Sequence, residues 1–359
     1  MVAHRGASAW GVAMATFSTL RTLASGLGLS AATVSEGLRD SPRVKLETRQ
    51  RIQQAAAAAG YVHNPLVGRV MADLRRRQLQ GCRGVIGALN LREQANPLRA
   101  RFQDAVLQGA TRRAEELGFG LELFWVGGKQ LSCKRLNVVL HTRGIQGVFV
   151  MPFEEPQDWS EVDWPNLCAV RMDYCLSKPA MHTVCPDHHS GLLHSIERLR
   201  GMGYRRVGLY VRHTAEKRIQ YKWTGALMSY HQLIPADERV PPLLVDTLEA
   251  DEFLAWFAEH RPDVIVGHHP IVIEWLGRRK LKVPKDVGFF NLNTTQEPHP
   301  SAGLDLRPHQ LGAAAVESVV AQLQRCERGI PSHPKTISIE GAWVDGPTVR
   351  SMIAQDTAA

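Results

Sequence analysis

The sequence lacks several features that define large classes of proteins. It has no run of about 18 uncharged apolar residues, which a membrane-spanning helix requires. Its six cysteines are scattered without a Cys-x2-Cys pair, which favours reduced thiols in a cytoplasmic protein. It also lacks a Gly-x-Ser-x-Gly elbow, a Walker loop and a His-Glu-x-x-His helix, and Gly81, Gly84 and Gly87 are too evenly spaced for a dinucleotide-binding fingerprint. We therefore expect no enzyme activity, no cofactor and no membrane partner.

Acidic residues are scarce in the first 80 positions. This segment contains eleven Lys and Arg against four Asp and Glu, whereas the other 279 residues contain 32 and 31. The positive charge is thus concentrated at the N-terminal end, as an electrostatic footprint for DNA predicts. The first fifteen residues lack a convincing apolar core with a cleavage site, so we expect a disordered tail there rather than a signal peptide.

Residues 20–38 have the pattern of two short helices broken at Gly28. An apolar stripe at helical spacing is formed by Leu20, Leu23, Ala24 and Leu27. Gly28 can adopt the left-handed conformation that ends the first helix, and Thr19 and Ser30 can cap the two helices. Val34 and Leu38 then complete a core from the second helix. An ordinary helical hairpin shares this spacing, but so does a helix-turn-helix, whose second helix enters the major groove of DNA.

The following segment makes a family resemblance specific. A turn precedes a third helix expected over 46–59, with Gly60 as its stop. In order and with the right gaps, the chain resembles the headpiece of the lactose-repressor (LacI/GalR) family at Thr33-Val34-Ser35, Ser41-Pro42-Arg43-Val44, Glu47-Thr48-Arg49 and Gly60-Tyr61 through Asn64-Pro65. The resemblance implies a three-helix headpiece, a hinge helix that orders in the DNA minor groove, and a periplasmic-binding-protein-like effector domain that dimerises.

Four positions depart from the family pattern. Glu36 replaces the usual Arg after Thr-Val-Ser, and a carboxylate repels phosphates unless it accepts from a cytosine amino group. Arg39 replaces an expected Asn, and Lys45 replaces the Ser or Thr that usually caps the third helix. In the hinge, Val70 stands where the family has its leucine wedge, and a smaller wedge unstacks a base step less well. We therefore expect DNA binding, with an operator sequence that does not transfer from relatives.

The expected DNA contacts come from the caps, the second helix, the following basic residues and the hinge. They are Thr19, Ser30, Ala31, Ala32, Thr33, Ser35, Glu36, Arg39, Arg43, Arg49, Asn64 and Val70.

The large remainder alternates strand and helix. We expect strands over 84–91, 121–126, 145–151, 167–172, 207–211, 243–245, 264–267 and 287–291. Helices are expected over 102–117, 191–202, 222–233, 249–260 and 271–279. This alternation predicts an α/β fold with parallel sheets in two Rossmann-like lobes, whose ligand lies in the cleft beyond the carboxyl ends of the strands.

Several stretches extend the family resemblance into this domain, among them 202–209, 261–266 and 306–316. The resemblance implies an arginine and carboxylates that hydrogen-bond sugar hydroxyls. Arg218 can supply the arginine and Asp187 one acid, whereas Asn293 and His269 replace other polar anchors. Trp223 and Phe153 could stack on a sugar face, although each is more often simply core. A small effector, carbohydrate-related, is therefore expected, but a different ligand or none stays open.

Two other interpretations are weaker. Cys185, His188, His189 and His194 lie close in sequence, but no pattern completes a tetrahedral metal site, so we expect no metal. A small-molecule binding protein with a vestigial helix-turn-helix, or a regulator with a degenerate cleft, also stays open.

The sequence thus predicts a cytoplasmic, nucleoid-associated homodimeric regulator, most simply a repressor, that binds operator DNA. The expected boundaries are a tail over 1–15, the all-α helix-turn-helix headpiece over 16–64, a hinge over 65–81, the two-lobed domain over 82–350 and a tail over 351–359.

Overall fold

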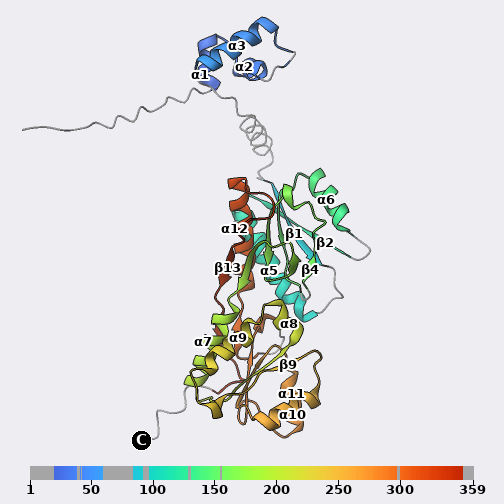
Figure 1. The fold of residues 1–359 in the computed structure, drawn as a ribbon, viewed down its shortest axis with the longest axis vertical. Helices are drawn as coiled ribbons and strands as arrows, with labels where there is room; N and C mark the ends of the chain where they lie inside the picture. Colours follow the sequence, from blue (N-terminus) through green and yellow to red (C-terminus); the bar gives the residue numbers. More distant parts are fainter. Residues whose placement is uncertain are drawn as a thin grey trace, which may run out of the picture. The chain divides into compact units, whose positions relative to one another are not determined.

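The computed structural model describes residues 20–38, 41, 43–59, 84–91, 97–127, 131–153, 156–296 and 300–350. The chain divides into two compact units, Met1–Gln80 and Gly81–Ala359, and each is described by itself. Both the α/β class and the N-terminal helical headpiece agree with the sequence predictions (Figure 1). No helix among the described residues is long and apolar enough to cross a membrane.

The headpiece consists of three helices, α1 (Leu20–Leu27), α2 (Ala31–Leu38) and α3 (Leu46–Ala58). Gly28 ends α1 with a φ of 68°, the left-handed conformation that glycine adopts without a Cβ clash. Leu23 and Ala24 of the predicted apolar stripe are buried in the core, and Leu27 packs against it. The other buried core side chains are Val34, Val44, Ile52 and Ala56. The helix-turn-helix geometry expected from residues 20–38 is therefore present.

The first lobe of the second unit is built on a six-stranded parallel sheet. Its order is β13-β7-β5-β3-β1-β2, with bounds β1 Val85–Leu91, β2 Gly120–Val126, β3 Gly147–Val150, β5 Cys168–Met172, β7 His182–Pro186 and β13 Thr336–Ile339. The helices of this lobe are α5 (Pro97–Glu116), α6 (Cys133–Thr142) and α12 (Pro308–Arg325) (Figure 1). A short sheet, β4 (Gln157–Asp158) with β6 (Leu176–Lys178), and a 3-10 turn, η1 (Trp164–Asn166), complete it.

The second lobe has a six-stranded sheet of order β14-β12-β11-β10-β8-β9, in which only β14 runs antiparallel to its neighbour. The strands are β8 Val207–Arg212, β9 Leu243–Val245, β10 Val264–Gly267, β11 Gly288–Asn291, β12 Gly303–Asp305 and β14 Ala342–Val344. The helices are α7 His188–Gly201, α8 His213–Arg218, α9 Lys222–His231, α10 Ala250–His260 and α11 Ile271–Arg278, with 3-10 turns η2 Ala236–Glu238 and η3 Thr294–Gln296.

The chain passes between the lobes three times. It leaves the first sheet after β7, returns after β12 through α12, adds β13 to the first sheet and then adds β14 to the second. Helices α5 and α12 pack backbone to backbone, because a Cβ on Gly312 would lie 2.0 Å from the carbonyl oxygen of Val106. These crossings hold the two lobes as one unit and place the ends of their strands around a common cavity.

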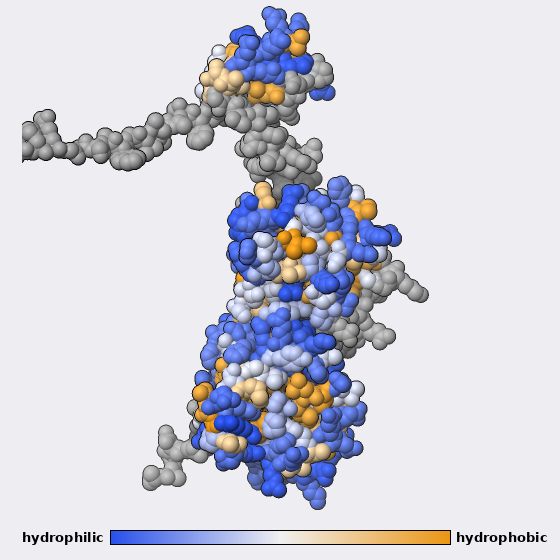
Figure 2. Space-filling view, in the orientation of Figure 1, coloured by the Kyte–Doolittle hydropathy of each residue, from blue (hydrophilic) through white to orange (hydrophobic). Residues whose placement is uncertain are grey.

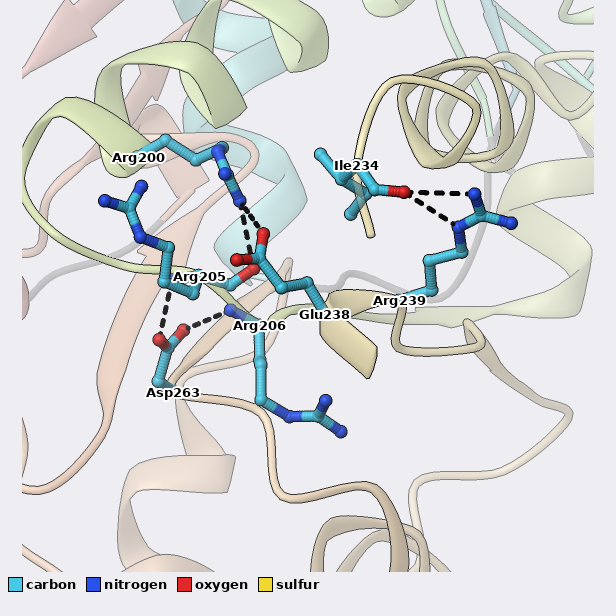
Figure 3. Close-up of polar contacts among 7 residues, drawn as sticks. All are labelled: Arg200, Arg205, Arg206, Ile234, Glu238, Arg239 and Asp263. Carbon is cyan, nitrogen blue, oxygen red and sulfur yellow. Dashed lines mark hydrogen bonds and ion pairs between the residues drawn. The ribbon is translucent and has the colours of Figure 1, made fainter. Parts of the chain in front are cut away.

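A polar network lies in the second lobe at the turns that precede β8 and β10 (Figure 3). The Asp263 carboxylate accepts from the backbone amides of Arg205 (2.7 Å) and Arg206 (3.0 Å), which ties the turn before β8 to the turn before β10. The Arg200 side chain donates to Glu238 at 2.5 Å. The Asp263 bonds satisfy two backbone amides just before β8. Hydrophilic residues cover much of the face of this unit drawn in Figure 2.

Most predicted elements are present, with shifted ends. Strands β9 and β10 have the predicted bounds, whereas α5 begins five residues earlier, at Pro97 rather than 102. The prediction missed the helices α6 and α8 and the strands β4, β6, β7, β12, β13 and β14. β13 is an exposed edge strand whose place in the first sheet depends on the chain's second crossing, through α12, which local pattern does not reveal.

Candidate DNA-binding face and interlobe cavity

The N-terminus of α2 is capped as predicted. The Ser30 hydroxyl accepts from the backbone amide of Thr33 at 3.1 Å and lies 2.8 Å from the Thr33 hydroxyl. A capping hydroxyl satisfies an amide that would otherwise lack a partner in the first turn. The cap thereby fixes the first turn of α2, which begins at Ala31 and Ala32. In a helix-turn-helix, the N-terminal part of the second helix faces the DNA.

One face of α2 packs on α3. Val34 is fully buried, and a Cβ on Gly37 would lie 2.5 Å from Cδ1 of Ile52. Because helical residues are about 100° apart, Glu36 lies on the side roughly opposite these contacts. The Glu36 side chain is 40% exposed, and its carboxylate lies 4.0 Å from the guanidinium of Arg43, whose side chain is 82% exposed.

Two arginines of α3 bond to backbone carbonyls elsewhere in the headpiece. The Arg49 guanidinium donates to the carbonyl of Val44 (3.1 Å), and that of Arg51 donates to the carbonyl of Leu27 (3.2 Å). Arg49, an expected DNA contact, is thus partly buried and bonded within the headpiece. Ser35 is half-buried on α2. Four further expected contacts, Thr19, Arg39, Asn64 and Val70, lie outside the described residues.

A cavity of about 100 Å³ lies between the lobes of the second unit. Five of the six expected effector residues line it, namely Phe153, Arg218, Trp223, His269 and Asn293. Asp187 does not line it. Its carboxylate accepts from the amide of Ser190 at 3.0 Å, because α7 begins at His188 and Asp187 is the residue that caps it.

A different carboxylate lies at the cavity. Asp173 directly follows β5 in the first lobe, in the left-handed region with a φ of 52°. It forms an ion pair with Arg218 of α8 in the second lobe, and its other oxygen lies 3.2 Å from Nε2 of His188. Burial alone would raise the pKa of this carboxyl, but Arg218 and His188 outweigh burial and hold the pKa well below its usual range.

An aromatic ring contacts His188, the second partner of Asp173. The Trp223 ring lies edge-on between His188, at a centroid distance of 4.9 Å, and His268, at 4.5 Å. Burial lowers the pKa of His268 well below its usual value, and burial together with the charge of Arg212 lowers that of His269 to about 4. Both imidazoles are therefore neutral at pH 7 and can each donate and accept one hydrogen bond.

Several buried polar atoms at the cavity have no hydrogen-bond partner within the described part of the chain. They are Nδ1 of His188, Nε of Arg218 and Nδ1 of His268. Asn293 is partly engaged, since its side-chain oxygen accepts from the amide of Thr295 at 3.2 Å. Buried polar atoms are nearly always paired, so this cavity is suited to a ligand or waters that carry hydrogen-bonding groups.

Sequence reasoning missed Asp173 and the role of His188. The available signal was the position of Asp173 at the carboxyl end of the strand expected over 167–172, where ligands of parallel sheets bind. His188 was weighed only as a metal ligand. Across the described ranges, no three His, Cys, Asp or Glu side chains are grouped to hold a metal ion, and the five cysteines in those ranges are free thiols.

Comparison with known proteins identifies the headpiece. Residues 19–64 match the family model described as bacterial regulatory proteins, lacI family. No curated protein sequence matches the chain. The family resemblance stated from the headpiece motifs is therefore confirmed for this segment.

Solved structures show the same fold over most of the chain. The transcriptional regulator CelR–cellobiose complex is 18% identical, with a TM-score of 0.54 over 92% of this chain and 99% of that one. The lac repressor dimer bound to operator and the anti-inducer ONPF is 16% identical, with a TM-score of 0.51 over 93% and 99%. A LacI transcriptional regulator from a Rhodococcus species is 15% identical, with a TM-score of 0.55 over 74% and 98%.

The two-lobed unit thus has the periplasmic-binding-protein-like fold of regulators, joined to a helix-turn-helix. The chain thus carries a lacI-family DNA-binding headpiece at residues 19–64, followed by a unit that shares the fold of these solved structures.

Proposed function

We propose that this regulator is a homodimeric repressor whose operator binding is controlled by a small, hydroxyl-rich metabolite held in the interlobe cavity. The observation that carries the proposal is the buried Asp173–Arg218 pair, which joins the two lobes at the cavity wall. A ligand that bonds to both groups gains or loses contacts whenever the lobes move. Its affinity therefore differs between lobe arrangements, so the ligand shifts the protein towards the arrangement that it binds more tightly.

The residues at the cavity suit a carbohydrate-related ligand. Ionised groups form strong hydrogen bonds to hydroxyls in a closed site, and both Arg218 and Asp173 are ionised at neutral pH. Neutral His269 and the amide of Asn293 offer donors and acceptors without further charge. Trp223 and Phe153 supply apolar rings on which the face of a sugar ring can stack. Asp187, which caps α7, has no part in the proposed site.

The DNA side of the proposal rests on the headpiece. A dimer presents two copies of α2 to two half-sites, and the spacing of those copies decides whether both fit at once. A ligand that alters lobe geometry would alter that spacing. The expected DNA-contacting residues are the same as those predicted from the sequence, except that Arg49 would act mainly by holding α3 to the loop before it.

The test is a thermal-shift screen of the full-length protein against sugars, sugar derivatives, nucleosides and amino acids. A ligand of the folded state raises the melting temperature by mass action. Arg218→Ala should abolish the shift given by the best compound, whereas Arg278→Ala, an exposed arginine on α11, should preserve it. No shift across the panel would instead favour an effector-independent regulator.

A further inference from the structure

The second helix of the headpiece carries a single charged side chain. Helix α2 reads Ala-Ala-Thr-Val-Ser-Glu-Gly-Leu, so Glu36 is its only ionisable residue. The contacts of Val34 and Gly37 with the core leave Glu36 on the opposite side of the helix. The longest polar side chain of α2 is therefore an anion on the face that a helix-turn-helix presents to the major groove.

An anion on that face is restricted in what it can contact. It cannot bind phosphates, and it can only accept hydrogen bonds from base edges. Two groups in the major groove donate, the N4 amino group of cytosine and the N6 amino group of adenine. Adenine presents the acceptor N7 beside its amino group, and this atom repels a carboxylate. We infer that Glu36 reads a cytosine, by accepting from its N4 amino group, at one position in each half-site.

Arg43 is placed to make this contact possible. The backbone amide of Ser41 donates to the carbonyl of Glu36 (3.1 Å), and the amide of Arg43 lies 3.4 Å from the Ser41 hydroxyl. The turn after α2 is thus bonded back to the end of the helix and holds Arg43 beside Glu36. The guanidinium offsets the repulsion between the carboxylate and the DNA backbone, and its remaining donors are available to a phosphate.

This inference rests on the proposed function, and one experiment separates the two. Full-length protein is used to select from a library of randomised duplex DNA, and the selected sites are sequenced for wild type, Glu36→Gln, Glu36→Ala and Glu47→Gln. Glu47, an exposed carboxylate on α3, is the matched control. Circular dichroism of each variant verifies that the helices are retained.

Wild type should select cytosine at one position per half-site. Glu36→Gln should change that position to adenine, because glutamine pairs with N6 and N7 of adenine, and Glu36→Ala should lose the preference there alone. We expect a change of about fivefold or more in Kd between the two bases at this position. Glu47→Gln should select the wild-type site.

Identical selected sites for wild type, Glu36→Gln and Glu36→Ala would overturn the assignment of Glu36 while leaving the regulator function intact. Failure of folded wild-type protein to select any sequence would overturn both, since no operator would then exist for Glu36 to read.

Discussion

Arg218 and Asp173 form a buried ion pair that joins the second lobe to the first. Their side chains are 15% and 10% exposed, and His188 supplies a second partner to the same carboxylate. A buried pair of this kind costs free energy to desolvate, so its net contribution is small while both members are present. Removing one member has a much larger effect, because the other charge stays buried without compensation.

Asp173→Asn should therefore lower the free energy of unfolding by about 3 kcal/mol. Glu340→Gln is the control, because its exposed pair with His194 should change stability by no more than about 0.5 kcal/mol. Urea denaturation of both variants measures the difference. Equal stabilities would show that the Asp173 carboxylate is not paired as described.

Stability should depend on pH through His269. Burial and Arg212 lower its pKa to about 4 in the folded protein, against about 6.5 for an ordinary histidine. The unfolded chain then binds more protons below pH 6.5, so the free energy of unfolding falls as pH drops from 6.5 towards 4. His269→Gln should flatten this part of the profile, whereas His333→Gln, an exposed histidine, should leave it unchanged. Parallel profiles for all three proteins would contradict the assignment.

Asp173 contributes at lower pH. Its carboxyl has a depressed pKa in the folded state, so its contribution is fully present above the ordinary value of about 4 and is lost as pH falls below it. Asp173→Asn should therefore differ most from wild type above pH 4 and converge with it in stronger acid. A constant difference across this range would mean that charge plays no part in the contact.

Two glycines offer a matched test of the α5–α12 packing. An added Cβ at Gly312 would lie 2.0 Å from a backbone oxygen of α5, whereas one at Gly225 of α9 meets nothing within 4 Å. Gly312→Ala should destabilise the protein by about 2 kcal/mol, because two backbones must separate. Gly225→Ala should stabilise it by about 0.5 kcal/mol through helix propensity. Calorimetry distinguishes them, and a stabilised Gly312→Ala would contradict the packing.

Ser30 provides a test in the headpiece. Its hydroxyl accepts from the amide of Thr33, so Ser30→Ala should destabilise α2 by about 1 kcal/mol and weaken DNA binding. Ser30→Asp keeps an accepting oxygen at the cap and should retain the fold. Hydrogen exchange of the Thr33 amide reports the effect, and unchanged exchange in Ser30→Ala would argue against the cap.

The local signals of the sequence predicted the headpiece well. Gly28, Ala24 and Val34 each act within a few residues of their position, so their spacing alone determines two helices and the turn between them. The effector residues were harder to predict. Asp187 and Asp173 both follow strands, but whether an acid caps a helix or lines a cavity depends on where the next helix begins. The second crossing, which returns the chain to the first sheet at β13, has no local signal, because an exposed edge strand has no strong apolar pattern.

The most direct test of the account is the affinity of the full-length protein for DNA upstream of its own gene, compared with scrambled DNA of equal length, at several salt concentrations. We predict tighter binding to the upstream DNA, weakening with salt, with a slope of log Kd against log salt that Arg43→Ala reduces by about one. The compound that raises the melting temperature should change this affinity in wild type but not in Arg218→Ala. Equal affinity for the two DNAs, unaffected by that compound, would contradict the account.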